Sequence, residues 1–117
     1  MQKLVKNPEW KDILFYPKAY EYVPRIAVNG LGPKGYGPWV KDTIGGICLT
    51  EAGHIHDAYY YLGRTSRKYA DQTFLRNMNV MIDKKAKSTF HRRYCKMIAY
   101  TYYLAVRMFG GSCYHRS

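Results

Sequence analysis

Two histidines and an aspartate lie within four residues of one another, at His54, His56 and Asp57. An imidazole can take or give a proton near neutral pH, and a carboxylate can orient an imidazole or bind a metal ion. If this stretch is helical, His56 and Tyr60 share a face, because residues four positions apart are neighbours on a helix. Asp57 is then turned by about 100° from His56, so the two side chains need separate partners.

The next acidic residue along the chain, Asp71, offers a partner for His56. Residues 63–67, GRTSR, form a short connection ahead of it, and a short connection makes consecutive helices antiparallel neighbours. Asp71 could then face His56 across the helix pair, with Tyr60 nearby to hold its carboxylate. We therefore expect a histidine–aspartate pair that leaves Asp57 available for a metal ion.

A glycine-rich segment precedes this stretch. Residues 28–47, VNGLGPKGYGPWVKDTIGGI, hold six glycines and two prolines, which predicts a long loop without regular structure. Glycine reaches backbone angles that other residues avoid, so the loop could turn carbonyl oxygens inward. Carbonyls and one carboxylate make a hard-oxygen site that suits calcium, and the loop could also present an N–H group to a developing oxyanion. A plain surface loop is the alternative.

The first predicted helix carries the histidines. From Leu49 the pattern becomes helical, with Thr50 as the expected N-cap and Glu51 in the first turn. Gly63 suits the C′ position, where a left-handed residue ends a helix.

Two further helices are predicted after it. The second starts after Ser66 and runs to about Asp83, and the third runs from Thr89 to Phe109. The apolar stripe of the second helix, which we expect in the core, is Ala70, Phe74, Leu75, Met78, Met81 and Ile82. One stripe of the third helix is Tyr94, Met97, Ile98, Thr101, Leu104, Ala105 and Met108. The predicted fold is mainly α.

The organisation expected for residues 1–117 is a single domain, as the length favours. An N-terminal arm (1–27), in which a short strand or extended segment is possible at 19–23, precedes the glycine-rich loop (28–47). The helical core (49–109) is an antiparallel helix pair and a third, C-terminal helix.

The charge balance favours an anionic partner. The chain has 19 Lys and Arg against 8 Asp and Glu, a net charge of +11, which suits nucleic acid, a phospholipid surface or an acidic protein. Trp39 could seat in a membrane interface. A basic run is either a solvated face or a surface that docks anionic lipid or nucleic acid. Its members are Lys84, Lys85, Lys87, Arg92, Arg93 and Lys96.

The location expected from the sequence is a soluble or peripheral one. The N-terminus has no apolar stretch typical of a signal peptide, and no apolar run approaches the roughly 20 residues of a membrane span. Cys48, Cys95 and Cys113 lie far apart without CxxC spacing, which favours reduced thiols in a cytosolic protein.

Other interpretations of the histidines are weaker. His54 and His56 point apart on a helix and lack a third zinc ligand at suitable spacing. An HD-type phosphohydrolase needs further His and Asp ligands over a longer helical domain. A nucleotide-binding loop would need the GK[ST] ending that residues 28–47 lack. An exposed polar pair at His56 and Asp57 remains the simplest alternative.

These motifs together resemble the phospholipase A2 superfamily. The resemblance rests on the loop VNGLG (28–32), the helix motif His56-Asp57-x-x-Tyr60 and the later Asp71. It implies calcium held by the carbonyls of Val28, Gly30 and Gly32 and by the Asp57 carboxylate, with the Gly30 amide at the oxyanion. It also implies that His56 is the general base, oriented by Asp71, which Tyr60 holds.

The chain differs from the secreted members of that superfamily in three respects. Val28 stands where they usually have tyrosine, their dense disulfides are absent, and the loop lies further from the histidine. The short spacing from His56 to Asp71 is more similar to the disulfide-free phospholipases of parvovirus capsids.

Four motifs, taken in order, also resemble a group of short phage and prophage proteins. These are GPKGYGPWVKDTIGG, IHDAYYYLG, ADQTFLRNM and YYLAVRMFGG, which span roughly residues 28 to 112. The resemblance implies a phage origin and a location in the virion or the host cytoplasm. The expected function is calcium-dependent hydrolysis of a phospholipid ester at anionic membranes. The alternative is a non-catalytic virion or host-interaction protein that binds nucleic acid or an acidic protein.

Overall fold

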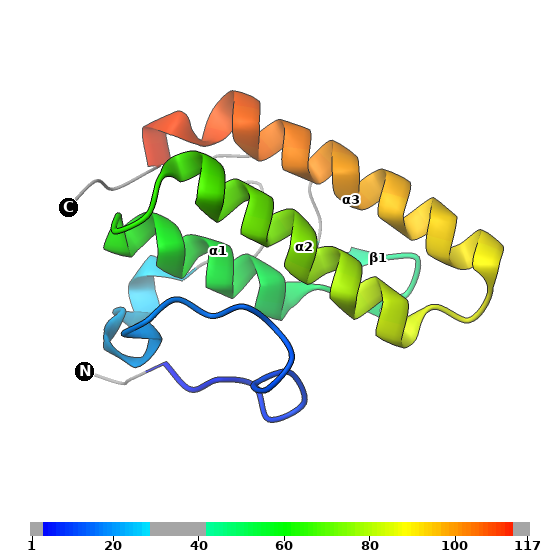
Figure 1. The fold of residues 1–117 in the computed structure, drawn as a ribbon, viewed down its shortest axis with the longest axis horizontal. Coiled ribbons are helices and arrows are strands. Elements are labelled where there is room, and N and C mark those ends of the chain that lie inside the picture. The colour runs from blue at the N-terminus through cyan, green and yellow to red at the C-terminus, as the bar shows by residue number, and fades with distance from the viewer. Residues whose placement is uncertain (1–3, 29–41, 114–117) are drawn as a thin grey trace.

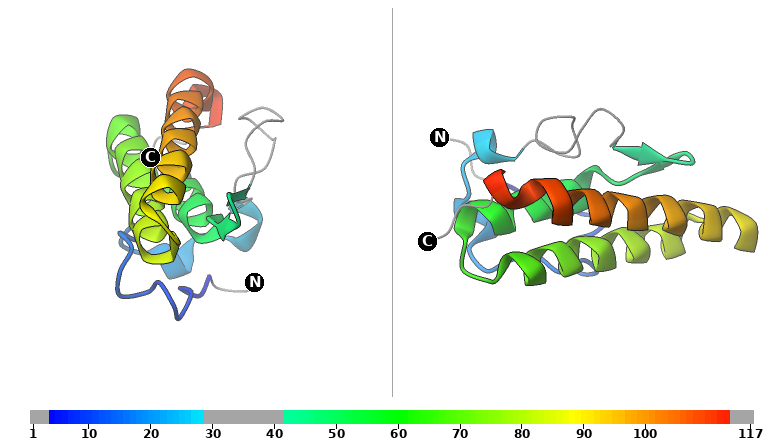
Figure 2. Two further views of the ribbon diagram at one scale, coloured as in Figure 1. Left: turned by 90° about the vertical axis from the view of Figure 1, so that its right-hand side faces the viewer. Right: turned by 90° about the horizontal axis from the view of Figure 1, so that it is seen from above.

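Three helices make up most of the structure, a computed structural model that describes residues 4–28 and 42–113 (Figure 1). They are α1 (Thr50–Leu62), α2 (Arg67–Lys85) and α3 (Thr89–Phe109). Each helix runs antiparallel to the one before it, and α2 packs against both of the others (Figures 1 and 2). The protein is therefore mainly α, as the sequence predicts.

The ends of the helices follow local capping rules with one exception. Ser66 and Ser88 cap α2 and α3 by accepting the N–H groups of Tyr69 and His91, both at 3.0 Å. Gly63 ends α1 in the left-handed region at φ 61°. The predicted N-cap at Thr50 is wrong, because Thr50 is already helical and Leu49 occupies the cap position without a side-chain hydrogen bond.

Glu51 takes over the role of fixing the start of α1. Its carboxylate accepts the N–H group of Asn7 at 3.0 Å and a hydrogen bond from the hydroxyl of Tyr16. Leu49 is buried, which explains why an apolar residue stands at the cap. The start of α1 is therefore fixed by long-range contacts of Glu51, and capping rules alone do not predict its first residue.

A small hairpin occupies the end of the segment that was expected to lack regular structure. Strands β1 (Thr43–Ile44) and β2 (Ile47–Cys48) pair antiparallel, so the prediction for residues 28–47 is wrong at its C-terminal end. Gly45 and Gly46 form the turn with φ angles of 53° and 84°, and residues other than glycine rarely adopt these angles.

His91 fastens this hairpin to α3. Its Nδ1 accepts the N–H group of Lys87 at 3.1 Å, so Nε2 carries the proton and donates to the carbonyl of Gly45 at 2.7 Å. A Cβ atom at Gly45 would lie 2.8 Å from the Sγ of Cys95. Glycine is thus needed at this position for both its φ angle and its lack of a side chain.

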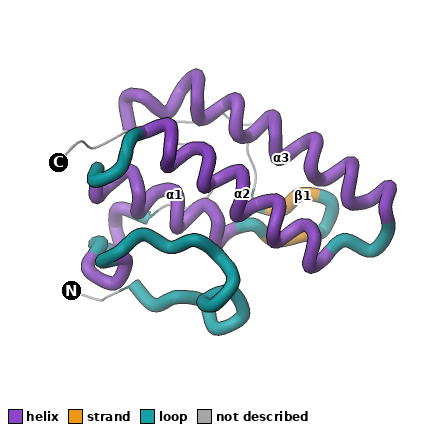
Figure 3. The backbone as a smooth tube through the Cα atoms, in the orientation of Figure 1, coloured by secondary structure: helices purple, strands orange, loops and turns teal. Residues whose placement is uncertain are grey.

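The N-terminal arm packs on the helices in the space below α1 and α2 (Figures 1 and 3). Its buried apolar residues join the same core as the helices; they are Leu4, Trp10, Leu14, Tyr20 and Val23. Asn77 accepts the N–H group of Phe15 at 2.9 Å, and the Tyr59 hydroxyl donates to the Phe15 carbonyl at 3.2 Å. The strand considered at 19–23 is instead a short 3-10 helix, η1 (Tyr20–Tyr22).

The predicted apolar stripes of α2 and α3 differ in burial. The α2 stripe is buried as expected apart from Leu75, which is only partly buried; α2 also runs two residues beyond the predicted end, to Lys85. In α3 the buried residues are instead Cys95, Ala99, Tyr102, Ala105 and Val106. Most of the stripe noted for α3 in the sequence, including Met97 and Met108, faces solvent.

Two findings on the described part of the chain concern the cysteines and a membrane span. Cys48 and Cys95 are free thiols. None of the described helices has both the length and the apolar character needed to cross a bilayer.

Candidate active site

The antiparallel packing of α1 and α2 brings His56 and Asp71 into direct contact. The Nε2 atom of His56 lies 2.7 Å from the Oδ1 atom of Asp71. Both side chains have a relative exposure of 0%. The contact predicted from the short connection between the helices is therefore present, and it lies in the core.

Asp71 is held on both of its oxygens. The hydroxyl of Tyr60 donates to Oδ1 at 2.5 Å, as expected, and the Nη1 atom of Arg107 donates to Oδ2 at 2.8 Å. The Nε atom of Arg67 lies 3.9 Å from Oδ2 and donates to the Tyr60 hydroxyl at 3.3 Å. A buried carboxylate needs such partners, because an unpaired buried charge is costly.

The two arginines are absent from the residues singled out in the sequence. Arg67 precedes Asp71 by four residues on α2, a spacing at which opposite charges meet on a helix, so this signal was available. Arg107 reaches the carboxylate from the end of α3, and no local pattern predicts that contact. Arg67 also donates to the carbonyls of Val106, at 3.0 Å, and Arg107, which closes the end of α3.

Aromatic packing fixes the plane of the imidazole. The ring centroid of His56 lies 4.3 Å from that of Tyr60 and 4.5 Å from that of Phe74. The ring is thus confined by one residue from its own helix and one from α2, while Asp71 holds Nε2. A group held in this way keeps one orientation, which a positioned proton acceptor requires.

The protonation states follow from these contacts. Burial lowers the pKa of His56 and outweighs the opposing effect of the Asp71 hydrogen bond. Burial acts to raise the pKa of Asp71, but hydrogen bonds from His56, Tyr60 and Arg107 leave it below its ordinary value. A neutral imidazole beside an ionised carboxylate donates from Nε2, so Nδ1 carries the lone pair and is the basic atom.

These directions predict an acid-sensitive fold. The unfolded chain binds a proton at His56 near pH 6.5, whereas the folded protein resists it, so stability is lost as pH falls below that value. The lowered pKa of Asp71 adds a loss of the same sign at lower pH. We expect the melting temperature to be level at pH 7–8 and to fall from about pH 6.5 downwards.

Thermal unfolding of His56→Gln measures how much of the acid sensitivity of the fold comes from His56. The variant should show a flatter profile than the natural protein between about pH 5 and 6.5. His54→Gln is the matched comparison: burial also lowers the pKa of His54, but its ring is partly exposed, so this variant should flatten the profile less than His56→Gln. An unchanged slope in the His56 variant, with a flattened one in the His54 variant, would show that His56 is not the acid-sensitive group.

The residues expected to bind calcium are only partly described. Gly30 and Gly32 lie outside the described residues, and Val28 ends the described arm just after the 3-10 helix η2 (Arg25–Ala27), which packs on α1. Asp57 is half-buried on α1. Burial, and then the charges of Glu51 and Asp57, raise the pKa of Tyr20, whereas Arg25 lowers it, so the Asp57 carboxylate lies near enough to the arm to act on Tyr20.

The far end of the glycine-rich segment is fixed near the same helix. The N–H group of Leu49, just before α1, donates to the carbonyl of Asp42 at 2.7 Å. The described residues hold no cluster of three His, Cys, Asp or Glu side chains suited to a metal. A site made mainly of backbone carbonyls would need only one carboxylate, so the proposed ligands fit calcium in type.

The basic run is divided between paired and unpaired charges. Lys85 pairs with Glu9, while Arg92 and Lys96 reach the Oδ1 atom of Asp83 at 3.2 and 2.8 Å. Among the described residues, the exposed members of the run that form no ion pair with a carboxylate are Lys84, Lys87 and Arg93. Trp39 lies outside the described residues. About half of the run is thus compensated by surface ion pairs, which contribute little to stability.

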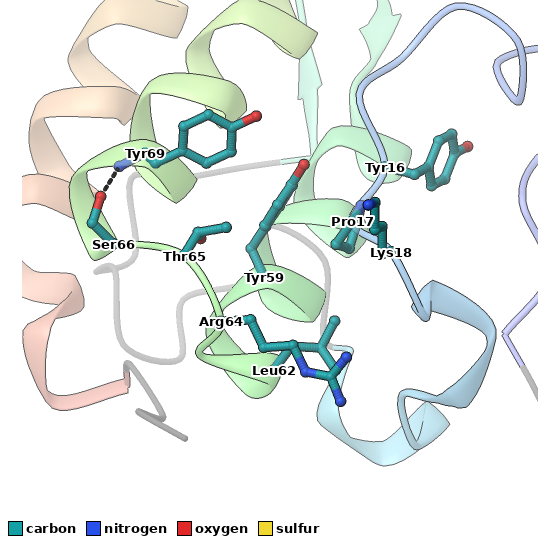
Figure 4. Close-up of a pocket in the computed structure, with 9 residues that line it drawn as sticks. All are labelled: Tyr16, Pro17, Lys18, Tyr59, Leu62, Arg64, Thr65, Ser66 and Tyr69. Carbon is teal, nitrogen blue, oxygen red and sulfur yellow. Dashed lines mark hydrogen bonds between the residues drawn. The ribbon is translucent and has the colours of Figure 1, made fainter.

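A separate cavity of about 660 Å³ lies between the arm and the connection from α1 to α2 (Figure 4). Tyr59 lies in the middle of the lining residues, between Tyr69 on one side and Lys18 on the other, and Arg64 also lines the cavity (Figure 4). Of the predicted catalytic and metal-binding residues that the structure describes, none lines it. The cavity therefore does not give access to the His56–Asp71 pair.

Comparison with known proteins adds no assignment to this geometry. Neither the protein-family models, nor the curated proteins, nor the solved structures contain a match to this chain.

Proposed function

We propose that the protein is a phage-encoded, calcium-dependent phospholipid ester hydrolase of the phospholipase A2 type. The observation that carries the proposal is the 2.7 Å contact between His56 Nε2 and Asp71, with the Tyr60 hydroxyl on the same carboxylate oxygen. The resemblance of the motifs to that superfamily implies this arrangement of a base, an orienting aspartate and a tyrosine. The role of the loop in binding calcium likewise rests on the resemblance of the motifs to that superfamily.

The chain's own residues supply the proton transfer. Nδ1 of His56 takes a proton from the attacking water, and the adjacent Asp71 carboxylate stabilises the imidazolium that forms. Tyr60 and Arg107 hold the carboxylate so that it stays ionised and in place. Calcium bound by Asp57 and the loop carbonyls would polarise the ester carbonyl, and the Gly30 amide would donate to the developing oxyanion.

Thermal unfolding with calcium tests the metal part of this proposal. Calcium at 100 times its dissociation constant should add about 2.7 kcal/mol to the free energy of unfolding. Asp57→Asn should abolish this gain, because it removes the only carboxylate proposed as a ligand. It should keep the fold, because Asp57 is only half-buried.

The matched control is Asp83→Asn, which removes a carboxylate from the exposed side of α2. This variant should keep the full calcium effect, and magnesium should replace calcium poorly because it demands a smaller octahedral site. A full calcium effect in the Asp57 variant would place the metal elsewhere.

A second candidate function is a non-catalytic virion or host-interaction module. It is favoured by the complete burial of the His56–Asp71 pair. The aromatic contact from Phe74 and the partly exposed Arg107 on the carboxylate also suit a structural network. In that case the +11 charge would bind nucleic acid or an acidic protein. A natural protein that releases no fatty acid in calcium, but binds nucleic acid or an acidic protein tightly, would favour this module.

A further inference from the structure

Helix α3 carries a line of large apolar side chains on its outer face. Phe90 is 81% exposed, Met97 62% and Met108 73%, and Tyr94 and Leu104 lie between them with more than a third of their surface exposed. Surface apolar residues scattered singly are ordinary, whereas a contiguous row of them marks an interaction site.

The spacing makes these residues one continuous stripe. With Thr101, the positions are 90, 94, 97, 101, 104 and 108, alternating by four and three residues, which keeps them on one side of a helix. Six positions over this range extend about 27 Å at 1.5 Å per residue. The buried residues Cys95, Ala99, Tyr102 and Val106 lie on the other side, against the rest of the protein.

The helix also lies at the edge of the molecule. Two perpendicular views place α3 on the outside of the bundle, with α2 on one flank and the arm on the far side of α1 and α2 (Figures 1 and 2). The outer face of α3 is therefore free of the described arm.

Positive charge runs alongside this stripe. Helix α3 has no Asp or Glu and has Arg92, Arg93, Lys96 and Arg107. Three of these reach carboxylates of α2, so the cationic side of α3 is the side towards α2. Arg93 is exposed and lies beside the stripe, three residues after Phe90 and four before Met97.

The charge indicates what covers the stripe. A second copy would bring another chain of +11 against an acid-free helix, which is repulsive. Nucleic acid would pair with the cations and leave the apolar row in water. An anionic lipid surface satisfies both features, because interfacial helices bury an apolar face at the acyl boundary and place cations at the head groups.

We propose that the outer face of α3, defined by Phe90, Tyr94, Met97, Leu104 and Met108, docks on anionic lipid. In naming the membrane contact of the proposed hydrolase, this inference rests on the proposed function. It also moves the membrane contact from Trp39 to the apolar face of α3, and it keeps Arg93, one member of the basic run, as the adjoining cation.

Sedimentation with phospholipid vesicles in EGTA tests the docking without hydrolysis. The natural protein should partition onto phosphatidylcholine vesicles that contain phosphatidylglycerol, and far less onto phosphatidylcholine alone. Met97→Glu should lower the partition coefficient about tenfold or more, because it places a charge in the apolar row. Met97→Leu should retain binding.

Ile26→Glu is the matched control, since Ile26 is 89% exposed on η2 and the substitution changes net charge equally. His56→Gln should bind as the natural protein does, so a failure of catalysis leaves this result unaffected. The proposal is overturned if Met97→Glu binds normally, or if both glutamate variants lose binding equally. It is also overturned if the natural protein is a dimer that Met97→Glu dissociates, which would assign the face to a second copy.

Discussion

Replacing His56 with glutamine is expected to slow fatty acid release by about 10²–10⁴-fold, the usual cost of losing a general base. Glutamine has a similar volume and can still donate a hydrogen bond to Asp71, so the core should stay packed. What it lacks is a lone pair that takes a proton near neutral pH. The measurement is the initial rate of fatty acid release from phosphatidylglycerol vesicles with calcium.

His54→Gln provides the control for this experiment. His54 lies two residues from His56 on α1, so the two side chains do not share a face, and it contacts Glu51 at 3.8 Å. Its loss should therefore leave the rate within a few-fold of the natural one. Equal rates in the His56 variant and the natural protein would exclude His56 as the base. A lowered rate together with a much lowered melting temperature would instead indicate a structural role.

Replacing Asp71 with asparagine is expected to cost about 3–5 kcal/mol of stability, the range seen when one partner of a buried charge pair is removed. The amide group would face the Nη1 donor of Arg107 with a donor of its own, and it would leave that guanidinium unpaired. The whole free energy of unfolding of a folded domain is only about 5–15 kcal/mol. The melting temperature should therefore fall by roughly 10 °C or more.

Asp83→Asn is again the matched control, because Asp83 carries two ion pairs but is half-exposed. Exposed pairs contribute about 0–1 kcal/mol, so this variant should melt within a few degrees of the natural protein. If urea titration gives equal losses for the two variants, the buried network around Asp71 is not a main support of the fold.

The pairing of His56 with Asp71 could be predicted because it depends on local features. Residues 63–67 are too few to do anything but reverse the chain, and Gly63 and Ser66 mark the two helix ends. Once the helices are antiparallel, the number of residues between two positions determines whether they face each other. Tyr60 follows for the same reason, one turn after His56.

Other parts of the structure depend on contacts between distant residues. Arg107 meets Asp71 across 36 residues, and Glu51 meets Asn7 across 44. The hairpin had a local signal, the pair Gly45-Gly46 between apolar residues, but the density of glycine and proline around it obscured that signal.

The α3 stripe shows a limit of periodicity itself. Apolar spacing of three and four predicts a helix, and it does not specify which of two apolar faces is buried. Small residues such as Ala99, with Cys95, allow α3 to approach the hairpin and α2 closely, whereas Met97 and Phe90 are left outside. The choice depends on the tertiary packing.

The release of sn-2 fatty acid by the natural protein tests the central claim most directly. Phosphatidylglycerol vesicles labelled in the sn-2 acyl chain are incubated with the protein in calcium or in EGTA, in ¹⁸O-water, and the products are identified by mass spectrometry. We expect labelled fatty acid that carries one ¹⁸O atom from water, released by the natural protein only with calcium and not released by Asp57→Asn. Vesicle-bound protein that releases no fatty acid in calcium, over a range of head groups, would contradict it.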